Sequence, residues 1–116
     1  MKNINNEKNN IDIPLTIDST ETIVSRIQQN EEFALGLYNE AIALFLNGEA
    51  ATSRLLLRDL VNATIGFEQL AKETLKPSKS LHRMLSVNGN PTMDNLALIF
   101  KIVSEQLNVN LQAKLI

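Results

Sequence analysis

The sequence predicts a mainly α-helical fold for this chain of 116 residues. Several stretches repeat apolar residues at the spacing of one helical face, and most follow a serine, threonine, aspartate or asparagine that can cap a helix. Alternating apolar and polar residues, which are typical of a strand, are clear only after Asn108. A hydrophobic content of 44% is enough for a buried core, and the absence of cysteine excludes disulfides and thiolate metal sites.

Two parts are expected along the chain. Residues 1–14 are polar and rich in asparagine, so we expect a flexible N-terminal arm there. Residues 15–116 are expected to form a single helical domain. No apolar run approaches the roughly 20 residues that span a bilayer, and the N-terminus lacks the apolar segment of a secretory signal. We therefore expect a cytoplasmic protein with no membrane partner.

The first two helices have clear start signals. Asp18 and Glu21 have the spacing of a capping box, so the first helix should begin at Asp18 or Ser19. Asn30 should cap the second helix, and Gly48 should end it because glycine readily adopts the left-handed conformation. The expected inward positions are Ile23 and Ile27 in the first helix, and Ala34, Leu37, Tyr38, Ala41, Ile42 and Phe45 in the second.

A third helix is expected over residues 50–64, and a last long helix after Thr92, which should cap it. The inward positions should be Leu56, Leu57, Leu60, Val61 and Thr64 in the third helix, and Leu96, Ile99, Phe100, Val103 and Leu107 in the last. The residues expected outside the inner face of the third helix are Arg54, Arg58 and Asp59. Residues 109–115 have the pattern of a short C-terminal strand, which would pair with its copy in a second subunit.

A helix-turn-helix is predicted over residues 67–86. Two short helices, residues 67–74 and 78–86, would be joined by a tight turn. Ala71 is small, as a residue must be where two steeply crossing helices approach most closely. Pro77 fits the first turn of the second helix, where its missing N–H is not needed. The apolar residues expected to anchor the pair are Phe67, Leu70, Ala71, Leu81, Met84 and Leu85.

The second of these short helices carries candidate DNA-binding side chains. If Leu81 and Met84 are buried, hydrogen-bond donors and cations project from the opposite face, which is the chemistry needed in the major groove. The candidate DNA-binding residues are Ser78, Lys79, His82, Arg83 and Ser86. Among them, Arg83 is suited to pair with guanine O6 and N7, and His82 to donate to a base or a phosphate. Candidate phosphate contacts, which fix register without reading sequence, are Lys72, Lys76, Asn88 and Asn90.

The charge distribution favours the C-terminal half for DNA binding. Residues 15–65 carry three arginines against seven acidic residues, whereas residues 66–116 carry six lysines or arginines against four acidic residues. Simpler interpretations stay open, because Lys79 and Arg83 could form only a solvated helix face and the two short helices could be plain packing. No nucleophile–base pair, metal cluster or phosphate-binding glycine loop is recognisable, so we expect neither an enzyme nor a cofactor.

The chain resembles the antidote proteins of bacterial addiction modules, the HigA-like group within the lambda-repressor-like fold. The matching pieces in the C-terminal half are Leu70-Ala71, Glu73-Thr74, Lys79-Ser80-Leu81, Arg83-Met84, Gly89-Asn90-Pro91 and Asn95-Leu96. Upstream, the matching pieces are Leu15-Thr16, Glu40-Ala41, Leu57-Arg58-Asp59 and the run from Asn62 to Phe67, so the resemblance covers roughly residues 15–113. Two departures concern the turn: many helix-turn-helix proteins have glycine at the position of Leu75 and an apolar residue at that of Lys76.

This resemblance implies a lambda-repressor-like helical bundle, usually a homodimer, that represses its own operon and often neutralises a RelE-like ribonuclease toxin. The resulting hypothesis is a sequence-specific regulator that binds double-stranded DNA at its own operator, the antitoxin of a type II toxin–antitoxin module. The alternative hypothesis is a protein-interaction module that binds a toxin or another partner without binding DNA. The acidic N-terminal half motivates this alternative, because a basic partner could dock there.

Overall fold

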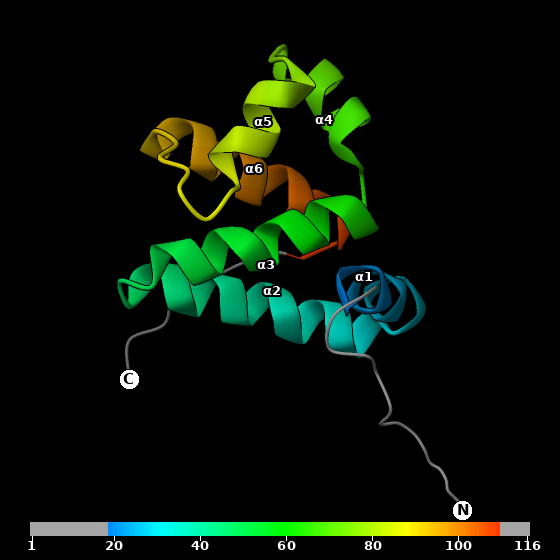
Figure 1. The fold of residues 1–116 in the computed structure, drawn as a ribbon. Helices are drawn as coiled ribbons and strands as arrows, with labels where there is room; N and C mark the ends of the chain where they lie inside the picture. Colours follow the sequence, from blue (N-terminus) through cyan, green and yellow to red (C-terminus); the bar gives the residue numbers. More distant parts are fainter. Residues whose placement is uncertain (1–18, 110–116) are drawn as a thin grey trace, which may run out of the picture.

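Six helices make up residues 19–109, the part of the chain that the computed structural model describes (Figure 1). They are α1 (Ser19–Gln29), α2 (Glu31–Leu46), α3 (Ala50–Ala63), α4 (Phe67–Thr74), α5 (Ser78–Met84) and α6 (Met93–Gln106). No strand occurs among these residues, so the prediction of a mainly α-helical bundle is confirmed. The predicted arm, Asp18 and all of the predicted strand except Val109 lie outside the described residues, and Val109 itself is not in a strand.

Three helix ends lie where their capping residues predict them. The Asn30 side chain accepts a hydrogen bond from the Phe33 N–H at 3.0 Å, and Thr92 Oγ1 accepts one from the Asn95 N–H at 3.1 Å. Gly48 follows α2 with a φ of 88°, the left-handed conformation that glycine favours. These three predictions are confirmed, because each capping group meets a backbone end that its own helix leaves unpaired.

Helices α2 and α3 form the long antiparallel pair at the base of the molecule, and α1 packs against both of them (Figure 1). Helices α4 and α5 lie on the opposite side of α3 from α2, and α6 lies behind them in this view. Helix α6 also contacts α2, since the Tyr38 hydroxyl donates a hydrogen bond to the Phe100 carbonyl oxygen at 3.0 Å. Helix α3 therefore separates the α4–α5 pair from α2.

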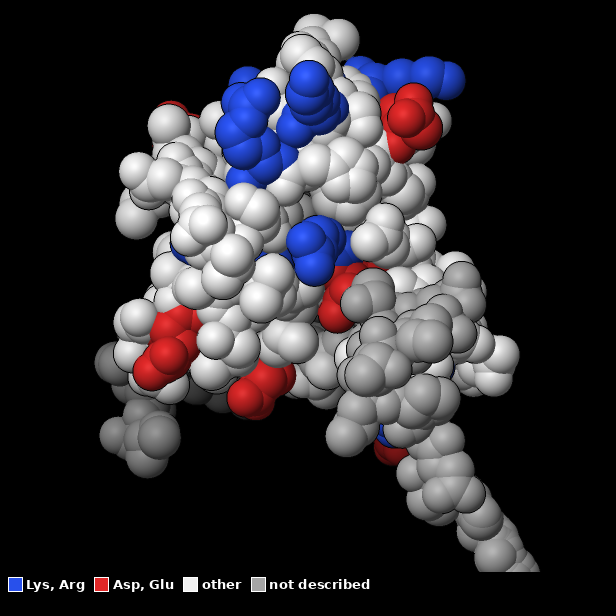
Figure 2. Space-filling model, viewed as in Figure 1, with Lys and Arg blue, Asp and Glu red and all other residues white. Residues whose placement is uncertain are grey.

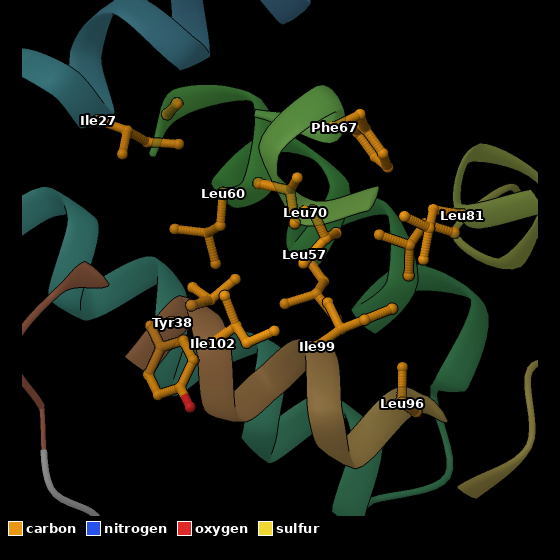
Figure 3. Packing of buried hydrophobic residues seen from close by; sticks show 14 of the residues in the cluster. Ile27, Tyr38, Leu57, Leu60, Phe67, Leu70, Leu81, Leu96, Ile99 and Ile102 are labelled. Carbon is orange, nitrogen blue, oxygen red and sulfur yellow. The ribbon is translucent and has the colours of Figure 1, made fainter. Parts of the chain in front are cut away.

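One buried apolar cluster draws side chains from all six helices (Figure 3). Leu57, Leu60 and Val61 of α3 lie at its centre with no exposed surface. The other helices contribute Ile27 from α1, Ala34 and Tyr38 from α2, Phe67 and Leu70 from α4, Leu81 from α5, and Leu96, Ile99, Ile102 and Val103 from α6. Because burial of apolar surface is the main source of folding free energy, α4 and α5 are held by the same core as the rest of the bundle.

One prediction for α3 is wrong, and one boundary differs by a single residue. Asp59 was expected outside the inner face, but only 9% of it is exposed. Burial raises the pKa of its carboxyl, and the neighbouring Arg58 opposes this increase. The helix also ends at Ala63 rather than Thr64, whose hydroxyl donates to the Leu60 carbonyl oxygen at 2.7 Å. The inner face is wider than the apolar pattern indicates, because α3 is covered by helices on several sides.

Candidate nucleic-acid interface

Helices α4 and α5 occur where the helix-turn-helix was predicted, and Leu75, Lys76 and Pro77 join them. Leu75 ends α4 in the left-handed conformation, with φ 57° and ψ 38°. The Lys76 N–H then donates to the Ala71 carbonyl oxygen at 3.2 Å, which closes the turn. Pro77 was predicted in the first turn of α5, but it is the extended residue that precedes the helix, and α5 has no side-chain cap.

Helix α5 is anchored along one side. Leu81 and Leu85 have no exposed surface, and Met84 is half-buried against the same core. Figure 3 shows Leu81 pointing into the core that Leu70 of α4 and Leu57 of α3 also enter. The rotation of α5 about its axis is therefore fixed, since a different rotation would expose both leucines.

The opposite side of α5 faces solvent. Lys79, His82 and Arg83 are exposed, and Ser78 is partly exposed. Lys79 and Arg83 are four residues apart on the helix, so they project from neighbouring turns of one face. Ser86 was predicted to be the last residue of this helix, but α5 ends at Met84; Ser86 lies in the following turn, where its hydroxyl donates to the Arg83 carbonyl oxygen at 2.8 Å.

His82 has a packing contact that the sequence did not predict. Its ring stacks on Phe67 at the start of α4, with 3.8 Å between the ring centroids and 19° between the planes. Phe67 is only 6% exposed, and His82 covers it while remaining exposed itself. The stack fixes the imidazole over α4, with one ring face used for packing.

The turn after α5 is held by two residues whose roles the sequence patterns do not predict. From α3, Arg54 Nε donates to the Ser86 carbonyl oxygen at 3.1 Å, and Nη2 donates to that of Val87 at 3.0 Å. Gly89 packs so closely against the end of α5 that an added Cβ would overlap the backbone of Arg83 and Met84. The glycine could be found in the sequence as a turn residue, whereas nothing in the pattern of α3 connects Arg54 to a loop 32 residues away.

The candidate phosphate contacts precede and follow α5 in the chain. Lys72 is exposed in the last turn of α4, and Lys76 is partly exposed in the connection. Asn88 and Asn90 are exposed in the turn that follows α5. The two lysines and the two asparagines thus flank α5 in the chain on both sides, where side chains could contact phosphates on either side of a groove.

The two sides of the molecule differ in charge. Figure 2 shows Lys and Arg gathered at the upper end, over α4 and α5, with most of the visible Asp and Glu lower down over α2 and α3. Helix α2 contains Glu31, Glu32 and Glu40, all exposed, and neither lysine nor arginine. The polar side of α5 therefore belongs to the cationic end of the molecule, the end suited to a polyanion.

Comparisons with protein-family models, with curated proteins and with solved structures found no match. None of the six helices is long and apolar enough to cross a membrane. Between residues 19 and 109, no three His, Asp or Glu side chains lie together as metal ligands would. Inferences about function therefore depend on the geometry and charge of the helix pair α4–α5.

Proposed function

We propose that the protein is a transcriptional regulator that binds double-stranded DNA in a sequence-specific manner, with α5 as its recognition helix. The observation that carries this proposal is the division of α5 into two sides. Buried Leu81 and Leu85 fix its orientation, and the opposite side presents Lys79, His82 and Arg83 to solvent. A short helix with donors and cations on its outer side matches the shape and the acceptors of the major groove.

Each exposed side chain has a role in this proposal. Arg83 pairs with a guanine, because its guanidinium can donate two parallel hydrogen bonds to O6 and N7. Lys79, Lys72 and Lys76 neutralise phosphates and set the register of α5 in the groove. Arg54 makes no base contact; it positions the end of α5 through the carbonyl oxygens of Ser86 and Val87.

The biological setting proposed is repression of the protein's own operon in the cytoplasm. Two copies would read a site with two-fold symmetry, as helix-turn-helix dimers do. The resemblance to HigA-like antidotes supports the further proposal that the protein is an antitoxin. Its toxin would then be a basic RelE-like ribonuclease, for which the acidic surface of α2 is the proposed docking site.

A titration of the DNA upstream of the protein's own gene tests this proposal. The fragment is labelled, and its Kd is measured by fluorescence anisotropy at two salt concentrations beside a scrambled duplex of the same length. Specific binding that weakens as salt rises is expected, because phosphate contacts release counterions. Arg83→Ala should raise the Kd for the specific site by about 5- to 150-fold, which corresponds to the roughly 1–3 kcal/mol of one bidentate base contact.

The matched control is Lys101→Ala, which removes the same charge from α6. Lys101 is exposed and pairs with Glu105 at 3.1 Å, away from α5 in the chain. Its loss should change the affinities for specific and scrambled DNA by the same small factor, through net charge alone. Equal effects of the two substitutions on specific binding would refute the role of α5, and no preference for the upstream fragment would refute the regulator.

The acidic surface of α2 favours a second candidate function, the binding of a basic protein. Glu31, Glu32 and Glu40 are exposed on a helix without lysine or arginine, so a cationic partner could be steered there. Co-expression with the product of the adjacent gene, followed by purification of the complex, tests this function. Glu40→Lys should weaken capture of the partner and leave the preference for the specific over the scrambled duplex unchanged, because net charge acts on both duplexes alike. Capture that is indifferent to this charge reversal would exclude α2 as the contact.

A further inference from the structure

Leu75 has an unfavourable backbone conformation, and its side chain gains nothing from folding. Its backbone is left-handed, with φ 57°, where a side chain is strained against its own carbonyl group. Its side chain is 91% exposed, the highest value among the exposed large apolar residues of residues 19–109. The other residues with positive φ in this part of the chain are Gly48, Gly66 and Asn108, residue types that tolerate it. Neither packing nor backbone geometry therefore accounts for a leucine at this position.

The position of Leu75 indicates what the side chain could contact. It lies three residues before Ser78, the first residue of α5, and the N-terminal part of a recognition helix is the part that approaches base edges. Three lysines are close to it in the chain, Lys72, Lys76 and Lys79, all with exposed surface. An apolar side chain among cations is poorly suited to an apolar protein surface, which would have to bury those charges. DNA offers phosphates to the lysines and one apolar group in the major groove, the 5-methyl of thymine.

We propose that Leu75 contacts a thymine methyl group beside the bases read by α5, and so adds a specificity contact from the turn. The inference rests on the proposed function, because it requires α5 to enter the major groove. Leu75 is then a specificity-determining residue whose apolar side chain is exposed only while DNA is absent. Burial of one methyl group contributes a factor of about four to the affinity.

Replacement of single thymines by deoxyuridine in the specific duplex tests this proposal, since only the 5-methyl group is lost. For the wild-type protein, one such replacement near the α5 contact should raise the Kd about fourfold. Leu75→Asn keeps a residue that tolerates the left-handed backbone and removes the apolar contact. It should bind the unmodified duplex about fourfold more weakly and should not respond to that deoxyuridine. Leu75→Met, which retains an apolar side chain, should keep most of the wild-type response.

Two controls separate the outcomes. Leu46→Ala removes another exposed leucine, 74% exposed at the end of α2, and should leave every Kd unchanged. Thermal unfolding followed by circular dichroism shows that each variant is folded. If Leu75→Asn binds specifically and responds to each deoxyuridine as the wild type does, the Leu75 contact is refuted and the regulator stands. If the wild type shows no specific site, the proposed function fails and this inference fails with it.

Discussion

Two helix pairs with three-residue connections, α2–α3 and α4–α5, differ at the residue that turns the chain. Between α2 and α3 the left-handed residue is Gly48, with φ 88°; between α4 and α5 it is Leu75, with φ 57°. The first turn uses the residue that the backbone favours, and the second does not. The α2–α3 turn therefore follows the backbone preference of its residue, whereas the α4–α5 turn departs from it, a departure that the proposed contact of Leu75 with DNA would explain.

We expect substitution in the turn that follows α5 to lower the free energy of unfolding more than any other change considered. Gly89→Ala places a Cβ against the backbone of Arg83 and Met84, which cannot move aside as a flexible side chain could. We expect a loss of about 1–3 kcal/mol in the free energy of unfolding, measured by urea denaturation, because overpacking displaces the turn.

The matched substitution in the other helix pair is Gly36→Ala. Gly36 lies within α2, and an added Cβ would meet no atom within 4 Å. This variant should gain about 0.5–1 kcal/mol, because alanine is the better helix residue. A Gly89→Ala variant as stable as the wild type would mean that the turn does not hold the end of α5.

How much of this architecture the sequence determines also differs between the two pairs. Short-range signals sufficed for most boundaries: Asn30, Gly48 and Thr92 act on backbone groups within a few residues. Similarly, the buried Leu81 and Leu85 follow from the helical period. The polar side of α5 was therefore predictable as a pattern, although its interaction with DNA stays a prediction.

Contacts between distant segments were not predictable from those patterns. The Arg54 hydrogen bonds and the His82–Phe67 stack depend on how α3, α4 and α5 pack, and polar or aromatic side chains carry no periodic signal for such pairs. Asp59 was misplaced for the same reason, because the helices that bury it come from elsewhere in the chain. Tertiary packing thus decides the details that position the candidate site.

A reciprocal pair of substitutions tests the difference in backbone strain between the two turns. Gly48→Ala should lose about 1 kcal/mol of unfolding free energy, because a Cβ strains the left-handed backbone. Leu75→Gly should gain about 0.5 kcal/mol, since relief of strain outweighs the extra freedom of glycine in the unfolded chain. Thermal unfolding of both variants beside the wild type measures this difference. If the melting temperatures of both variants shift in the same direction, the left-handed backbone does not favour glycine equally in the two turns.

The least sensitive position is Asp59 in α3, a helix that belongs to the first pair and contacts α4 of the second. Burial raises the pKa of this carboxyl in the folded protein, so the folded state binds the proton more tightly than the unfolded state does. Proton binding to Asp59 therefore stabilises the folded protein fully below the unfolded-state pKa of about 4. This stabilisation is lost as pH rises through the raised pKa of the folded state. Asp59→Asn should therefore raise the melting temperature at pH 7, and this advantage should shrink as pH falls.

Glu40→Gln provides the control, because it removes one negative charge from an exposed position of α2. Its melting temperature should follow that of the wild type across the same pH range. An Asp59→Asn variant that is less stable than the wild type at pH 7 would contradict this expectation. It would show that the contacts of the buried carboxylate contribute more free energy than its desolvation costs.

Backbone amide chemical shifts measured while the upstream DNA duplex is added show which helix pair contacts DNA, because they report on both pairs in one titration. If α5 reads the DNA, the largest changes fall on residues 75–90, and the amides of α2 remain unchanged. Changes concentrated on α2, or an unperturbed α5 in the saturated complex, would contradict this assignment.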